Sequence, residues 1–187
     1  MNKDTPTKSA LPPIEDRLSF LIHRINAQLA RICNPFFGTL DMDLYSSRIL
    51  VILLEKGAVR VGELVDLMAL PQSTISHQLQ RLEKRGLLTR NRVSSDNRSV
   101  TVKLSKEGNR AAQQCNATSA IVYDAMIKDM NAEDLEILRH HMSAMFERLK
   151  SFDGADVLHQ QSAAAKPSTG RTKAQQPWPS RRKVGSG

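Results

Sequence analysis

The chain has 187 residues, of which 40% are hydrophobic and 25% are charged, and it carries a net charge of +8. This length and apolar content suit one domain with its own core, and the basic excess indicates a polyanionic partner. Two cysteines without paired spacing exclude a disulfide framework and a zinc motif, and the longest aliphatic run, Ile49–Leu54, is far shorter than the roughly 20 residues of a membrane span. Because the first residues also lack the apolar core of a signal peptide, we expect a cytoplasmic protein.

The N-terminal part of the chain predicts a loose arm followed by a helix. Residues 1–13 are polar and contain three prolines, so we predict a flexible arm there. From Ile14 onward, apolar residues recur at helical spacing on one face: Leu18, Leu21, Ile22, Ile25, Leu29 and Ile32. We expect Asn34-Pro35 to end or kink this helix, because proline lacks the N–H donor and restricts the residue before it.

Three shorter helices are predicted next. The first runs from about Leu44 to Lys56, with Asp41 or Asp43 as its cap and Gly57 at its exit. A second helix covers Val61–Met68, and Leu70-Pro71 breaks the chain after it. The third runs from about Gln72 to Arg85, since proline is tolerated near a helix start and Gly86 suits the exit.

A β-hairpin and two long helices complete the predicted domain. The hairpin has strands at Leu87–Arg92 and Ser99–Leu104, the second of which alternates apolar and polar residues as half-buried strands do. One helix follows from about Lys106 to Met130, and the last begins after Asn131, a good N-cap. Its apolar residues form the narrow seam of packed helices: Leu135, Leu138, Met142, Met145 and Leu149. We expect residues 153–187 to be a disordered basic tail, because they bury too little apolar surface to offset their ordering entropy.

The positive charge is concentrated between Pro71 and Lys103, which hold seven basic residues against two acidic ones. On a helical wheel, Ile75, Leu79 and Leu82 share the buried side of the helix that starts at Gln72. The opposite side is polar and basic, which suits a nucleic-acid surface. The candidate DNA-contacting residues are Gln72, Ser73, Thr74, Ser76, His77, Gln80, Arg81, Lys84, Arg90, Arg92, Asp96 and Arg98.

These candidates have different expected roles. The N-terminal half of a recognition helix usually reads bases, so we assign Ser73, Ser76 and His77 to base edges, with Gln72 beside them. Arg81 and Lys84 are expected to hold the phosphate backbone. In the hairpin, Asp96 can orient Arg98 toward a narrow minor groove. A solvent-exposed amphipathic helix would by itself explain the polar and basic residues that follow Pro71, and an ordinary turn would explain Asp96. Neither alternative explains the succession of helix, turn, helix and basic hairpin.

In this order of elements the chain resembles the MarR family of transcriptional regulators over about residues 14–152. The resemblance rests on five features: Leu70–Ser76, Leu82–Leu88, Arg90, Asp96–Arg98 and Leu104–Gly108. It implies a mainly helical winged helix-turn-helix fold with a small β-wing. It also implies a DNA-binding lobe at about 43–104 and dimerisation helices at about 14–36 and 106–152.

The resemblance further implies a homodimer on double-stranded DNA with a pseudo-palindromic operator, usually as a repressor. Arg98 would be the wing-tip residue in the minor groove, held by Asp96. Many members of the family release DNA when a small aromatic or phenolic ligand binds between the dimerisation and DNA-binding regions.

Other functions were weighed against this one. A redox-sensing regulator acting through Cys33 is one alternative, although a buried structural thiol is the simpler interpretation of Cys33 and of Cys115. An architectural DNA-binding protein with little sequence preference is another, and a protein-interaction adapter that reuses the winged fold is a third. We find no catalytic constellation and no paired metal ligands in the sequence, so we expect neither an enzyme nor a metal or other cofactor.

Overall fold

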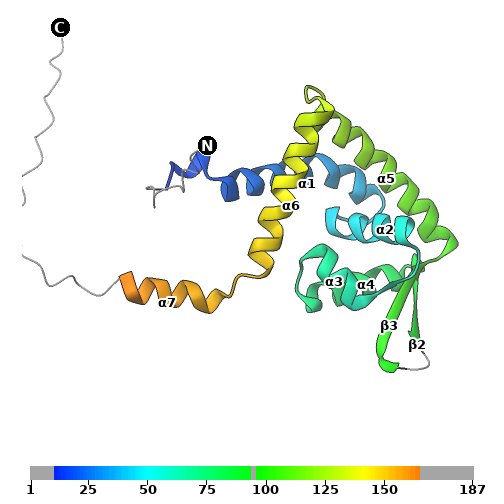
Figure 1. The fold of residues 1–187 in the computed structure, drawn as a ribbon. Helices are drawn as coiled ribbons and strands as arrows, with labels where there is room; N and C mark the ends of the chain where they lie inside the picture. Colours follow the sequence, from blue (N-terminus) through cyan, green and yellow to red (C-terminus); the bar gives the residue numbers. More distant parts are fainter. Residues whose placement is uncertain (1–10, 94–95, 165–187) are drawn as a thin grey trace, which may run out of the picture. The chain divides into compact units, whose positions relative to one another are not determined.

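The computed structural model describes residues 11–93 and 96–164 (Figure 1). Contacts divide the chain into two compact units, the first ending at Asp129 and the second starting at Met130. The first unit contains η1 (Ile14–Asp16), α1 (Leu18–Thr39), α2 (Leu44–Lys56), β1 (Val59–Arg60), α3 (Val61–Met68), α4 (Gln72–Lys84), β2 (Leu88–Val93), β3 (Asp96–Leu104) and α5 (Lys106–Ile127). The second contains α6 (Ala132–Lys150) and α7 (Gly154–Ala164).

The fold is mainly helical with one small antiparallel sheet, as the sequence predicted. The strand order is β1-β3-β2, so β3 lies in the middle and the β2–β3 hairpin extends from the helices (Figure 1). Leu88 pairs with Leu104 at the base of the hairpin, and Val93 pairs with Asp96 at its far end. The hairpin strands therefore reach further toward the tip than the predicted strands, which ended at Arg92 and began again at Ser99.

Strand β1 was not predicted. Val59 pairs with Val102 and Arg60 with Thr101, directly before α3 begins. Two residues give no readable alternation, so the pairing arises from the tertiary structure rather than from local pattern. It joins the start of α3 to the central strand of the sheet.

Helices α2, α4 and α5 enclose the core of the first unit. The fully buried side chains include Ile49, Leu50 and Leu53 from α2, together with Phe37, Leu64, Ile75, Leu79, Leu82, Leu88, Val102 and Cys115. Helix α2 begins at the predicted cap: the Asp43 carboxylate accepts a hydrogen bond from the Ser46 amide, and the Ser46 hydroxyl accepts one from the Asp43 amide. This reciprocal capping box satisfies two amides that a helix start leaves open.

We expected Asn34-Pro35 to end or kink helix α1, and the structure rules out an end there. The helix continues through Pro35 to Thr39. Proline inside a helix costs about 3 kcal/mol, because it removes one backbone hydrogen bond and crowds the preceding turn. Burial of Phe37, which is 0% exposed and lies two residues after Pro35, offsets that cost. The Asn34 side chain contributes as well, since its oxygen accepts a hydrogen bond from the Leu44 amide at 3.0 Å.

The C-terminal helices differ from prediction at their ends. Helix α5 stops at Ile127, slightly before the predicted Met130, and Asn131 caps α6 by accepting from the Asp134 amide. Helix α7 corrects the expectation that the chain after Phe152 has no regular structure. Its first turn is stabilised where the Asp153 carboxylate accepts from the Ala155 amide, and alanine, glutamine and leucine favour the helix that follows. The rest of the predicted tail, residues 165–187, lies outside the described residues.

Candidate nucleic-acid interface

Helices α3 and α4 form a helix-turn-helix with the predicted boundaries. Helix α3 ends at Met68, and Ala69 takes a left-handed backbone conformation with φ of +50°. Leu70 and Pro71 then lead into α4, which begins at Gln72 as predicted and ends at Lys84. Gly86, with φ of +70°, turns the chain toward β2. The short turn therefore fixes α4 against α3 and places the hairpin directly after it.

Helix α4 separates an apolar face from a polar one, as the helical wheel predicted. Ile75, Leu79 and Leu82 are at most 1% exposed. Five of the candidate residues on the polar side are exposed (Gln72, Ser73, His77, Gln80 and Lys84), and Thr74 and Ser76 are half-buried. The polar side chains are thus available to a partner along the full length of the helix.

Two of the candidate arginines are engaged by acidic residues of the same unit. Arg90 on β2 places Nε 3.0 Å from the Glu83 carboxylate, and its Nη2 donates to the Ser76 carbonyl at 3.5 Å. Arg81 places Nη1 3.8 Å from the Asp43 carboxylate. Arg81 therefore has a protein partner in the free chain, and its expected contact with the phosphate backbone stays a prediction.

The three hairpin candidates could not be placed in this way. The side chains of residues 92–99 lie outside the described residues, and they include Arg92, Asp96 and Arg98. The backbone of β2 and β3 brings these three residues to the far part of the hairpin. Their roles stay predictions.

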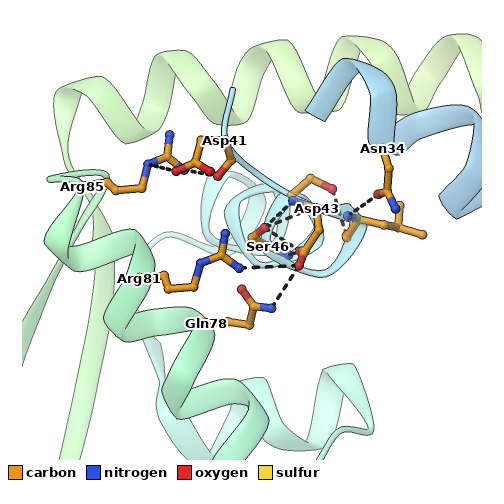
Figure 2. Close-up of polar contacts among 9 residues, drawn as sticks. Asn34, Asp41, Asp43, Ser46, Gln78, Arg81 and Arg85 are labelled. Carbon is orange, nitrogen blue, oxygen red and sulfur yellow. Dashed lines mark hydrogen bonds and ion pairs between the residues drawn. The ribbon is translucent and has the colours of Figure 1, made fainter. Parts of the chain in front are cut away.

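The turn between α1 and α2 makes a set of polar contacts with α4 that the sequence did not predict (Figure 2). Gln78 donates from Nε2 to Asp43 Oδ2 at 3.2 Å, next to the Arg81 contact. One helical turn further on, Arg85 donates to the carbonyls of Leu40 and Asp41 at 2.5 and 2.7 Å. We call these residues the turn clamp: Leu40, Asp41 and Asp43 on the turn, and Gln78, Arg81 and Arg85 on or directly after α4.

Gln78 was missed because it is polar, yet it is only 8% exposed. A signal was present in the sequence: on the wheel Gln78 falls beside Leu82, at the edge of the apolar arc that Ile75, Leu79 and Leu82 form. A polar residue at such a position is buried only with a partner, and here the partner is Asp43.

The electrostatics at Asp43 follow from its partners. Burial alone would raise the pKa of Asp43, but hydrogen bonds from Ser46 and Gln78 and the nearby charge of Arg81 together lower the pKa below its ordinary value. The carboxylate is therefore ionised at neutral pH and can act as the common acceptor for α2 and α4.

A polar cavity of about 440 Å³ lies among α3, α4 and the sheet. Its lining residues are Arg60, Val61, Gly62, Glu63, Gln72, Ser76, Arg90 and Val100. Arg60 is exposed and was not among the predicted residues. The cavity brings the predicted base-reading residues Gln72 and Ser76 next to two arginines.

We compared the sequence with those of known proteins and protein families. The sequence model of the MarR family matches residues 46–100, which span α2 to the first half of β3. The organic hydroperoxide resistance transcriptional regulator of Bacillus subtilis (strain 168) is 24% identical over 136 residues, covering 73% of this chain and 91% of that protein. The multiple antibiotic resistance protein MarR of Escherichia coli (strain K12) is 23% identical over 124 residues, covering 66% and 86%. Residues 46–100 of the chain therefore match the MarR family, and the chain is similar to these two proteins over most of their length.

Solved structures share the fold of this chain. A mutant MarR from E. coli complexed with operator DNA superimposes with a TM-score of 0.61 at 22% identity, covering 73% of this chain and 99% of that one. The S. aureus MepR–DNA complex gives a TM-score of 0.64 at 16% identity, covering 71% and 98%. The chain shares the winged helix fold of these structures, and the Bacillus subtilis relative is named as a transcriptional regulator.

A second cavity in the first unit is mostly apolar. It measures about 380 Å³ and is lined by Tyr45, Arg48, Val51, Ile52, Leu67, Met68 and Ser119, from α2, α3 and α5. Its size falls within the range of small-molecule sites. Arg48 is its one cation, and its guanidinium lies 3.4 Å from the Asn26 side-chain oxygen on α1.

Both cysteines are buried free thiols. Burial raises the pKa of Cys33, against the opposing charge of Arg48, and raises the pKa of Cys115 to about 11.

Within residues 11–93 and 96–164, no helix is both long and apolar enough to cross a membrane.

Proposed function

We propose that the protein is a cytoplasmic homodimer that represses transcription from a pseudo-palindromic operator and releases it when a small aromatic ligand binds. The observation that carries this proposal is the exposed polar face of α4, which lies beside the β2–β3 hairpin. A helix presented in this way enters a major groove, and two such helices in a dimer read half-sites about 10 base pairs apart.

Within the proposed complex, the exposed residues of α4 divide into two groups. Ser73, Ser76 and His77 carry hydroxyl and imidazole groups that can hydrogen-bond base edges, and Gln72 lies at the same end of the helix. Lys84, at the other end, is exposed and neutralises backbone phosphate. Arg98, oriented by Asp96 and accompanied by Arg92, is assigned to the adjacent minor groove.

Exposed apolar side chains on two helices support the proposed homodimer. Helix α1 exposes Leu18, Ile22, Ile25 and Ile32, each at least 43% accessible. Helix α6 exposes Ile137, Leu138, Met142, Phe146 and Leu149 to a similar or greater extent. Contiguous apolar surfaces of this kind mark association sites in soluble proteins. We assign α1 and the helices after β3 to dimerisation, and residues 43–104 to DNA binding.

The apolar cavity lined by α2, α3 and α5 supports the proposal that a small molecule binds the protein. Aliphatic walls suit an aromatic ring, while Arg48 can pair with a carboxylate or phenolate and Tyr45 can hydrogen-bond beside it. The cavity adjoins α2 and α3, so a bound ligand alters the support of the helix-turn-helix.

Binding-site mapping in cells tests the proposal, followed by anisotropy titrations on the recovered fragment and on a scrambled duplex. We expect a preference for the operator of about 10³-fold or more. Alanine at both Ser73 and His77 should remove most of that preference, whereas the control Lys128→Ala, on the far end of α5, should not. Equal binding to both duplexes would favour the architectural alternative. A function in cells that survives alanine at both His77 and Arg98 would favour the adapter.

A separate experiment tests the dimer. Ile25→Glu places a charge on the exposed apolar face of α1, and we expect it to yield monomers in sedimentation velocity and to weaken operator binding. Arg24→Glu, a neighbouring change outside the apolar stripe, is the matched control.

The structure gives little support to redox sensing by Cys33. Sensor cysteines are accessible and have a lowered pKa, whereas Cys33 is 3% exposed and its pKa is raised. Operator release by peroxide that disappears in Cys33→Ser would restore this alternative.

A further inference from the structure

Asp43 occupies an unusual place for an acidic residue. It lies next to α4, which the proposed function sets against a polyanion, and its side chain is 36% exposed. A carboxylate there repels phosphate and lowers affinity for DNA unless it serves another purpose. Its two carboxylate oxygens have different partners (Figure 2). Oδ1 caps α2 by accepting hydrogen bonds from Ser46, whereas Oδ2 accepts a hydrogen bond from Gln78 and forms an ion pair with Arg81.

We propose that Asp43 is a positioning residue for DNA recognition, and that Arg81 acts through Asp43 rather than as a phosphate contact. The inference rests on the proposed placement of α4 in the major groove. Through Oδ2 the α1–α2 turn fixes the rotation and height of α4, so that the base-reading side chains meet the groove in one register.

The burial of Gln78 makes this positioning strict. Its amide is almost fully enclosed, and its Nε2 has the Asp43 carboxylate as partner. Rotating α4 by one residue would turn the amide by about 100° away from Asp43. The Gln78 amide, whose buried Oε1 has no hydrogen-bond partner among the described residues, would then lose the partner of its Nε2 as well, and Asp43 would keep only its contacts with Ser46. The observed rotation of α4 is therefore favoured over its neighbours.

The remaining contacts of the turn clamp fix a second point on the same face. Arg85 donates two hydrogen bonds to the carbonyls of Leu40 and Asp41, and its Nε lies 3.5 Å from the Asp41 carboxylate. Two contacts on one face, about one and a half to two helical turns apart, restrain tilt as well as rotation. On the other side of the turn, Asn34 accepts from Leu44, so the same segment is also joined to α1.

The test separates capping from positioning. Asp43→Ser keeps a good N-cap, but its short side chain cannot reach Gln78 or Arg81. Ser46→Ala is the matched control, because it removes half of the capping box and leaves Asp43 Oδ2 in place. We expect Asp43→Ser to bind the operator roughly tenfold more weakly, in the range of coupling between contacting residues. Binding to scrambled duplex should be as tight as that of the wild type or tighter, because the variant has lost a negative charge beside α4. We expect Ser46→Ala to lower the melting temperature without changing the ratio of the two affinities.

Arg81→Gln supplies an independent readout that leaves the cap intact. A phosphate contact contributes about 0.9 to the slope of log affinity against log salt. As a positioning residue, Arg81 should leave that slope unchanged, and the double variant with Asp43→Ser should bind no more weakly than either single variant. A slope reduced by about one, with additive losses, would overturn the inference, as would wild-type operator affinity in Asp43→Ser.

The experiments distinguish a failure of the proposed function from a failure of the positioning role of Asp43. If alanine at Ser73 and His77 leaves operator preference unchanged, α4 does not read the bases and both proposals fail. If that pair abolishes the preference while Asp43→Ser retains it, the positioning role alone is wrong.

Discussion

Arg90 on β2 and Glu83 on α4 face each other across the base of the wing, with Arg90 Nε 3.0 Å from the Glu83 carboxylate. The contact is an ion pair rather than an aligned hydrogen bond. Together with the donation from Arg90 to the Ser76 carbonyl, it joins the hairpin to the helix that precedes it. The two elements proposed to enter adjacent grooves are therefore held together by side chains as well as by the chain connection at Gly86.

Removing the charge at Glu83 should have two opposite effects. Both side chains are partly exposed, so we expect Glu83→Gln to lower the free energy of unfolding by at most about 1 kcal/mol. The change also removes a negative charge beside the DNA-binding face, so binding to scrambled duplex should tighten a few-fold at low salt. Urea melts and anisotropy titrations measure the two effects. Unchanged binding to scrambled duplex would show that this acid does not face the DNA.

Stability in acid should depend on Asp43. Its pKa is lower in the folded chain than in the unfolded one, so ionised Asp43 contributes stability above its unfolded pKa, about 3.9, and that contribution is lost as pH falls through the folded pKa. We therefore expect Asp43→Ala to be less stable than wild type at pH 7, and the difference to shrink steadily below about pH 4. Urea unfolding at pH 7, 5 and 3 provides the comparison. A constant difference across this range would contradict a lowered pKa.

Gly108 is packed too tightly to accept a side chain. A Cβ at this position would lie 1.7 Å from the Leu87 carbonyl oxygen, which is backbone and cannot move aside cheaply. We expect Gly108→Ala to destabilise the protein by roughly 3 kcal/mol or more, as overpacked core positions do. Thermal melts of purified protein measure this.

Gly62 provides the matched control for Gly108. It also lies in a helix, α3, but a Cβ there meets no atom within 4 Å. Gly62→Ala should therefore stabilise the protein by about 0.5–1 kcal/mol, because alanine loses less backbone freedom on folding. Equal effects of the two substitutions would show that the Leu87 contact is not rigid.

The two thiols should resist modification in the native protein. Cys115 is 0% exposed and its pKa is raised to about 11, so very little thiolate is present at pH 8. We expect a thiol-specific reagent to modify neither cysteine on the timescale of minutes, and both to react at once in denaturant. Rapid labelling of the Cys33→Ser variant under native conditions would contradict this for Cys115.

The sequence predicted elements whose pattern is local. The boundaries of α3 and the start of α4 followed from apolar spacing and the Leu70-Pro71 break, and Asp43 and Asn131 were recognisable caps. The elements that were missed depend on distant partners. Helix α1 passes Pro35 because Phe37 is buried beyond it, and β1 exists only through pairing with β3.

The candidate site shows the same division. The wheel correctly separated the buried face of α4 from its exposed polar face, since that depends on helical periodicity alone. It could not show that Arg81 meets Asp43, 38 positions earlier in the chain, or that Arg90 meets Glu83 across a turn. A basic residue on a polar face looks the same in sequence whether its partner is a phosphate or a carboxylate.

The alanine at position 69 has a consequence for how the molecule reaches DNA. Glycine would take a φ of +50° without steric cost, whereas alanine adopts it at some expense and has fewer other conformations available. The turn between α3 and α4 is therefore stiffer than it would be with glycine at position 69. The angle between these two helices is fixed before DNA binds. Little ordering entropy remains to be lost on association at this joint, so adaptation to different operators has to come from elsewhere in the protein or from bending of the DNA itself.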